Sequence, residues 1–180
     1  MASTPQRSSG ALGWVFAAAS FLGAALLFWI QPLAGRVLLP QLGGAPFVWV
    51  TCLAFFQLVL FGGYLSVHLT RTLAASRLQL AVLLTLVGVA LWRSPRLLDP
   101  LASSLPVPAL AVLAFLGDRL GLACLALGCT APLLQRAYAQ RFGREPYRLY
   151  AVSNAGSLLG LLAYPFLIEP QWSSSAQEPA

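Results

Sequence analysis

Charged residues are scarce in this chain. Its 180 residues include no lysine, and only 9% carry a charge, whereas 58% are hydrophobic. Soluble domains usually contain about 25% charged residues, so the composition excludes an ordinary soluble domain. Disorder is excluded as well, because disordered chains combine low hydrophobicity with high charge. The composition predicts an all-α, polytopic integral membrane protein.

Residues that carry chemistry are also few. The chain has five acidic residues, one histidine and three cysteines, and it contains no Walker loop, HExxH or GxSxG motif. Cys52, Cys124 and Cys129 lie in apolar runs and form no CxxC pair, so neither a disulfide framework nor a zinc site is indicated. We expect no metal, no cofactor and no catalytic residue, and the residues alone do not predict an autonomous enzyme.

All eleven basic residues are arginines, and the net charge is +6. A basic stripe with interleaved aromatic residues would indicate nucleic-acid binding, but these arginines stand mainly between hydrophobic runs. They are better explained as a topology signal or as contacts to anionic lipids. The lipid bilayer is therefore the expected partner, and nucleic acid is not.

Hydrophobic runs long enough to cross a bilayer dominate the chain. A disordered tail is expected over residues 1–10, a transmembrane domain over 11–170 and a polar tail over 171–180. The five predicted spans are residues 11–30, 45–69, 78–92, 109–134 and 149–168. A signal peptide is the alternative for the first run, but the run continues well beyond the cleavage-like residues 17–19.

Proline and glycine mark the predicted connections. Residues 31–40 contain two prolines and precede Gly43-Gly44, which predicts a short re-entrant or interfacial connection. Residues 95–108 contain four prolines and predict a loop. A basic loop around Glu145 is expected to hold four arginines, Arg136, Arg141, Arg144 and Arg148.

The run over residues 109–134 is interrupted by Asp118-Arg119. It can form one broken helix, or two half-helices that meet at Gly117-Asp118. Adjacent charges do not face each other on a helix, so each should need another partner. The pair is either a proton or substrate relay, or a helix break near the interface with both groups solvated.

The distribution of arginine predicts the orientation. Seven arginines fall on the N-terminal side of the five predicted spans and three on the opposite side. This places the N-terminus in the cytoplasm, in a multi-pass protein of the inner membrane.

Polar residues inside the apolar runs are candidate sites, because they are costly in lipid. In the second span Gln57, Tyr64 and His68 fall within about 40° of one another on one face. They line a polar cavity or make hydrogen bonds between helices. Without carboxylate or cysteine neighbours, His68 does not indicate a metal site.

The last span carries small residues at helical spacing. Ser153, Gly156, Ser157 and Gly160 share a face, and Gly156 and Gly160 form a GxxxG pair that would let another helix approach closely. Asn154 in the same span needs a hydrogen-bond partner. Packing between helices explains this face better than contact with a substrate.

Several stretches, taken in order, resemble a known family. They are Phe28–Pro46 (FWIQPLAGRVLLPQLGGAP), Thr130–Arg136 (TAPLLQR), Tyr147–Ser157 (YRLYAVSNAGS) and Tyr164–Pro170 (YPFLIEP). Together they are similar to the membrane portion of bacterial spermidine-synthase-like membrane proteins, often described as fused major-facilitator and spermidine synthase proteins. The resemblance covers roughly residues 11–170.

The resemblance implies a helical bundle like an incomplete half of a major-facilitator transporter, which normally has six spans. In that family an aminopropyltransferase-like domain usually follows the membrane portion. No position of this chain matches that domain, so no catalytic residue carries over. We therefore expect a truncated or split gene product, or a chain that works with a partner. Asp118-Arg119 departs from the uncharged residues expected there.

The expected function is a membrane module of a spermidine-synthase-like system, non-catalytic, with a transport-like or scaffolding role. The alternative is a small transporter or permease subunit that acts as an oligomer. Expected partners are a second membrane subunit or further copies of the chain, and a separate aminopropyltransferase-like subunit. The residues most expected to matter are Gln31, Arg36, Gln57, Asn154 and Glu169.

Overall fold

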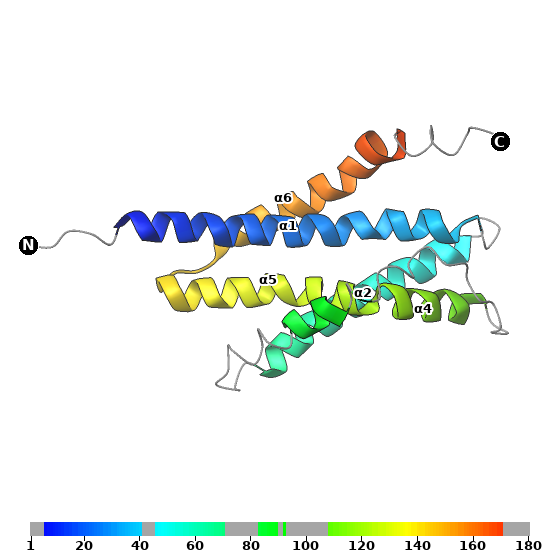
Figure 1. Cartoon of the computed structure of the whole chain (residues 1–180), viewed down its shortest axis with the longest axis horizontal. Coiled ribbons are helices and arrows are strands. Elements are labelled where there is room, and N and C mark those ends of the chain that lie inside the picture. The colour runs from blue at the N-terminus through cyan, green and yellow to red at the C-terminus, as the bar shows by residue number, and fades with distance from the viewer. Residues whose placement is uncertain (1–5, 41–45, 71–82, 90–91, 93–107, 171–180) are drawn as a thin grey trace, which may run out of the picture. The chain divides into compact units, whose positions relative to one another are not determined.

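The structure, a computed structural model, describes residues 6–40, 46–70, 83–89, 92 and 108–170 (Figure 1). The described part of the chain is helical and contains no strand. Its helices are α1 (Gln6–Leu38), α2 (Pro46–Leu69), α4 (Pro108–Arg119), α5 (Gly121–Phe142) and α6 (Tyr147–Ala163), followed by a π-helical turn, η3 (Tyr164–Ile168). Residues 83–89 are also helical; the rest of the predicted span 78–92, except Trp92, lies outside the described residues.

Two helices are long and apolar enough to cross a membrane, over Gly10–Leu38 and Pro46–Leu69. A third crossing is counted if α4 and α5 together form one span. The chain is thus a helical protein with two or three candidate membrane spans among its described residues, and these indicate a membrane protein.

The first helix corrects two predictions. It begins at Gln6, inside the predicted disordered tail, and it continues to Leu38, through the segment predicted to be a connection. Pro32 lies inside the helix. A proline removes only one backbone donor, and leaving the helix in an apolar environment would leave more backbone groups without partners. Helical continuation is therefore favoured over the predicted connection.

Proline also stands at helix starts. Pro46 and Pro108 are the first residues of α2 and α4, and Pro146 is the N-cap of α6. Proline suits the first turn, because the N–H that it lacks would have no partner within the helix. The predicted loop over residues 95–108 therefore ends at Pro108 where α4 begins; its other residues lie outside the described part.

The predicted basic loop is mostly helical. Arg136 and Arg141 belong to α5, which extends to Phe142, and Arg148 lies in the first turn of α6. Gly143 follows the last residue of α5; it has φ 60° and donates its N–H to the carbonyl oxygen of Ala139 at 2.9 Å. Glycine adopts this left-handed conformation without steric penalty.

The run over residues 109–134 forms two helices rather than one. Helices α4 and α5 are bent by 67° relative to each other, with Leu120 between them. Leu120 donates its N–H to Leu116 O at 2.8 Å and accepts from Cys124 N–H at 2.9 Å. The break thus lies two residues beyond Asp118, and these hydrogen bonds continue across it.

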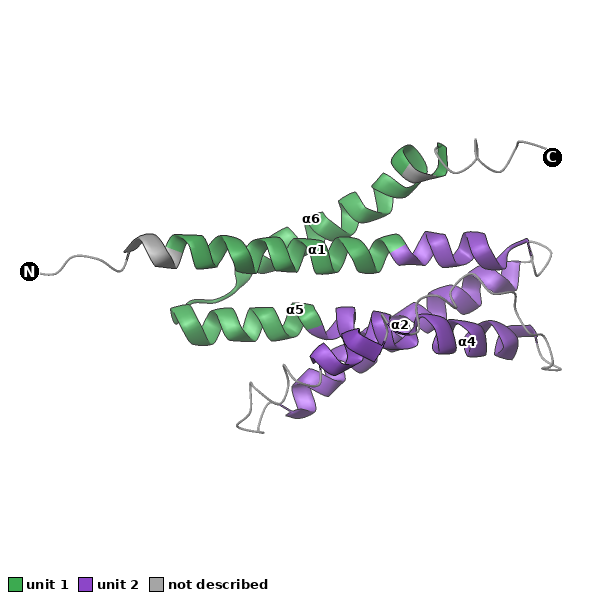
Figure 2. Ribbon diagram, viewed as in Figure 1, with its two compact units in different colours: residues 1–29, 130–180 green, residues 30–129 purple. Residues whose placement is uncertain are grey.

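The helices divide into two compact units (Figure 2). Unit 1 contains residues 1–29 and 130–180, and unit 2 contains residues 30–129. In unit 1, α1 packs against α6 and against the C-terminal part of α5. In unit 2, α2 packs against α4 and against the N-terminal part of α5.

Candidate functional site

Asp118 and Arg119 form an ion pair at the end of α4. Arg119 Nε lies 3.1 Å from Asp118 Oδ2, which corrects the expectation that these neighbours cannot face each other. Arg119 is the last residue of α4, where the flexible arginine side chain can fold back toward its neighbour. Its guanidinium carbon lies 5.5 Å from the centroid of the Phe115 ring, one turn earlier, at a distance that suits a cation–π contact.

The two side chains of this pair differ in burial. Arg119 is 15% exposed and Asp118 is 46% exposed, so the carboxylate is the accessible partner. A cation in the last turn of a helix also interacts favourably with the helix dipole. The pair therefore consists of a mostly buried arginine and an exposed carboxylate, and it lies beside the bend between α4 and α5.

The polar stripe of α2 lies on an exposed face. Gln57, Tyr64 and His68 are all exposed. The buried residues of α2 lie about 80–180° around the helix from the centre of the stripe; they are Val48, Cys52, Phe55, Phe56, Gly63 and Val67. The stripe therefore does not line the packed side of α2 within unit 2.

The C-terminal end of α1 lies in unit 2 with two of the predicted residues. Gln31 and Arg36 are both half-buried there. Between them Gly35 meets the indole of Trp49, since a Cβ built on this glycine would lie 2.7 Å from Trp49 Cη2. The absence of a side chain at position 35 thus lets α1 and α2 approach.

Helices α2 and α5 cross with their backbones in contact. A Cβ on Gly63 would lie 2.8 Å from the carbonyl carbon of Gly128. At the same crossing, Cys129 Sγ lies 3.6 Å from the carbonyl oxygen of Gly63 and donates a weak S–H hydrogen bond to it. Such contacts between small residues are typical of helices in membranes.

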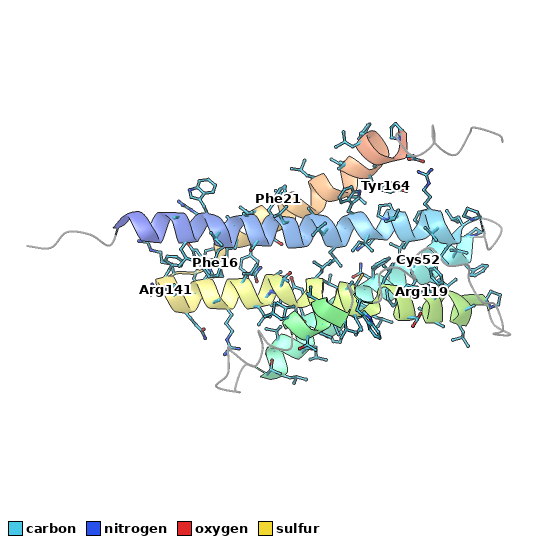
Figure 3. The ribbon with its side chains drawn as sticks, in the orientation of Figure 1. Phe16, Phe21, Cys52, Arg119, Arg141 and Tyr164 are labelled. Atoms are coloured by element: carbon cyan, nitrogen blue, oxygen red, sulfur yellow. The ribbon has the colours of Figure 1, made fainter. Side chains whose placement is uncertain are left out.

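Helices α1 and α6 meet in the same manner in unit 1. A Cβ on Gly156 would collide with the carbonyl oxygen of Phe21, and one on Gly160 with that of Ala25. Because residue numbers rise together along both helices, α1 and α6 run parallel. Figure 3 labels Phe21 where α6 passes α1.

The remaining predicted residues of unit 1 differ in burial. Ser153 and Ser157 are half-buried, and the hydroxyl of Ser157 donates to the carbonyl of Ser153 at 3.1 Å. Asn154 and Glu169 are exposed. The glycines of this face thus make the helix contact, whereas the serine hydroxyl is satisfied by its own helix.

An aromatic cluster joins α1 to α5 in unit 1. The ring centroid of Phe16 lies 5.7 Å from that of Tyr138 and 6.1 Å from that of Phe142, edge to face in both cases. Figure 3 labels Phe16 on α1. Two turns along α1, a Cβ on Gly23 would lie 2.9 Å from the hydroxyl oxygen of Thr130. Since Phe16 meets Tyr138 and Gly23 meets Thr130, the two helices run antiparallel.

The predicted polar residues of unit 2 lie in different settings. Unit 2 holds Asp118 with Arg119 at the bend, and the α2 stripe on an exposed face. Among the described residues, no group of three His, Cys, Asp or Glu side chains could hold a metal ion. The most distinctive arrangement is the set of glycine contacts between helices. It includes the predicted GxxxG pair of α6 and also the α2–α5 crossing, which was not predicted.

Sequence reasoning missed two members of these contacts, namely Gly63 and Gly128. A signal was present, because both glycines stand within apolar runs, where a small residue permits close approach of helices. It was missed because Gly63 and Gly128 belong to different helices, so that no spacing along the chain relates them. Comparison of the chain with protein-family models, curated proteins and solved structures finds no match.

Proposed function

We propose that the chain is the membrane-embedded module of a spermidine-synthase-like system, scaffolding or transport-like and without a catalytic centre of its own. The observation that carries this proposal is the pair of glycine-mediated crossings, α1 with α6 and α2 with α5. Apolar helices gain little from the hydrophobic effect inside lipid, so close packing of small residues holds them together. A chain built mainly from such contacts suits a structural module.

Five spans in the inner membrane, with a cytoplasmic N-terminus, form part of the proposal. Helix α6 and η3 extend together from Tyr147 to Ile168, which gives about 33 Å at 1.5 Å per residue and matches the hydrocarbon thickness. Helices α1 and α2, the bent α4–α5 pair and the segment around residues 83–89 supply the other four. The proposed arrangement is an incomplete half of a major-facilitator-type transporter, as the resemblance of the sequence implies.

The link to polyamine chemistry rests on the resemblance of the stretches quoted above. The test is purification of the tagged chain from native membranes in mild detergent, with subunit composition read by mass spectrometry. A stoichiometric aminopropyltransferase-like protein supports the proposal. If the chain is purified with its other native partners but without an aminopropyltransferase-like protein, the assignment to a spermidine-synthase-like system is overturned.

A small transporter is the second candidate, and the bend between α4 and α5 favours it. Broken helices near the bilayer midplane are typical binding sites in transporters, and here the 67° bend adjoins an exposed carboxylate. Asp118→Asn would then abolish uptake of radiolabelled spermidine into vesicles containing the chain, with Glu145→Gln, at an exposed carboxylate between α5 and α6, as a control that retains uptake. Uptake that is absent from the unaltered chain, or indifferent to Asp118, excludes this candidate.

A further inference from the structure

The exposed face of α2 has an amide at its centre. Gln57 is the twelfth of the 24 residues of α2 and is exposed. It lies about 17 Å from the start of the helix, which is near the middle of a hydrocarbon layer about 30 Å thick. An amide has two donors and an acceptor, and lipid tails satisfy none of them.

The residues around Gln57 follow a coiled-coil spacing. Six of the exposed residues of α2 follow one another at alternating intervals of four and three, namely Val50, Ala54, Gln57, Phe61, Tyr64 and His68. At 100° per residue they fall within an arc of about 80°. We call these six residues the α2 seam. Such a repeat is that of a helix packed along its length against another helix.

We propose that the α2 seam is a docking surface for the α2 helix of a second copy of this chain, with the two Gln57 amides hydrogen-bonded to each other. The inference rests on the proposed passage of α2 through a membrane. Copies of one chain insert with the same orientation, so their α2 helices run parallel and Gln57 meets Gln57 at the same depth. An amide is both donor and acceptor, so two identical side chains are complementary.

The seam lies opposite to the packed side of α2. Around the helix, the six buried residues of α2 lie about 100–160° from the seam's centre. A second helix can therefore dock on the seam without disturbing the contacts of α2 with α4 and α5. The expected geometry is a left-handed crossing near 20°, which heptad spacing favours.

The test is energy transfer between donor- and acceptor-labelled full-length chains in phosphatidylcholine vesicles, over a range of protein-to-lipid ratios. The unaltered chain is expected to associate. Gln57→Leu should weaken association about three- to thirtyfold, as expected for loss of a hydrogen bond between membrane helices. Gln57→Asn, which keeps the amide, should retain most of it, and Leu58→Ala, an exposed site beside the seam, should match the unaltered chain.

Disulfide trapping tests the same surface with a matched pair. Phe61 on the seam is 64% exposed and Leu58 beside it is 65% exposed. Oxidation should link Phe61→Cys into dimers several-fold more efficiently than Leu58→Cys. The native cysteines are buried, so the unaltered chain gives the background.

Three outcomes would overturn the inference. They are an absence of energy transfer at every ratio, equal transfer for the unaltered chain and Gln57→Leu, and cross-linking of Phe61→Cys in native membranes to a different protein. Extraction of the vesicles at alkaline pH distinguishes failure of the α2 seam inference from failure of the proposed function. A chain released from vesicles does not span the membrane, whereas an embedded but monomeric chain contradicts the α2 seam alone.

Discussion

The thiol of Cys129 donates to the carbonyl oxygen of Gly63 across 3.6 Å. That distance depends on Gly63, because a side chain there would lie 2.8 Å from the carbonyl carbon of Gly128, the residue before Cys129. The contact joins residues 66 positions apart, and it fixes which faces of the two helices meet. The two glycines nevertheless differ in the space available to them.

Gly63→Ala should destabilise the protein, and Gly128→Ala should not. A methyl group on Gly63 would lie 2.8 Å from backbone carbon, whereas one on Gly128 would meet its nearest neighbours at 3.6 Å, an ordinary contact. Overpacking of this kind reduces the free energy of unfolding by about 1–3 kcal/mol. Denaturant titration in micelles measures both variants, and equal stabilities would contradict the crossing described here.

The α1–α6 contact predicts two variants whose effects on the free energy of unfolding are not additive. Gly156→Ala and Gly160→Ala would each force a methyl group into a backbone carbonyl of α1, at an expected loss of about 1–3 kcal/mol. The double variant should lose less than the sum, because the first methyl already separates the helices. Gly13→Ala, which meets nothing within 4 Å, is the control.

Phe16→Leu should loosen the contact between α1 and α5. It removes two edge-to-face ring contacts, each worth about 0.5–1.5 kcal/mol, so we expect a loss of about 1–3 kcal/mol in the free energy of unfolding. Trp14→Leu, at a side chain that is 78% exposed, should leave stability within about 0.5 kcal/mol. Thermal unfolding followed by circular dichroism compares them; a larger effect at Trp14 would refute the cluster's role.

Tyr164→Phe should raise stability. The Tyr164 side chain is buried, and its hydroxyl has no hydrogen-bond partner among the described residues. Removing a buried polar group without a partner relieves a penalty of about 1–3 kcal/mol. Tyr150→Phe, at an exposed side chain, should change little. A loss of stability in Tyr164→Phe would show that the hydroxyl is bonded.

Asp118→Asn should affect stability only slightly. The carboxylate is 46% exposed, and exposed ion pairs contribute less than about 1 kcal/mol. Arg119 retains its position over Phe115 in that variant. Chemical denaturation of purified protein gives the comparison, and a loss above about 2 kcal/mol would mean that the pair supports the bend.

Local patterns in the sequence predict the helices better than the contacts between them. Apolar length places α2 at residues 45–69, against Pro46–Leu69 in the structure, and Asp118-Arg119 marks the break within 109–134. Proline misleads at residues 31–40, because an apolar environment keeps the backbone helical through Pro32. Whether a proline ends a helix depends on its surroundings, which the local sequence does not contain.

The candidate site shows the same limit. Spacing identifies Gly156 and Gly160 as a face but does not reveal that α1 lies against it, since that information is in the fold. Likewise, the periodicity of Gln57, Tyr64 and His68 shows that they share a face of α2. The periodicity does not show whether that face is buried or exposed, because this depends on where α4 and α5 pack against α2.

Helix α1 is longer than a bilayer is thick. Its apolar part, Gly10–Leu38, has 29 residues and measures about 44 Å, against about 30 Å of hydrocarbon. Such mismatch is relieved by a steep tilt or by emergence of one end. If the end that contains Pro32 emerges, Arg36 reaches the depth of the lipid phosphates. The thickness of the membrane would then determine how much of α1 lies outside the hydrocarbon.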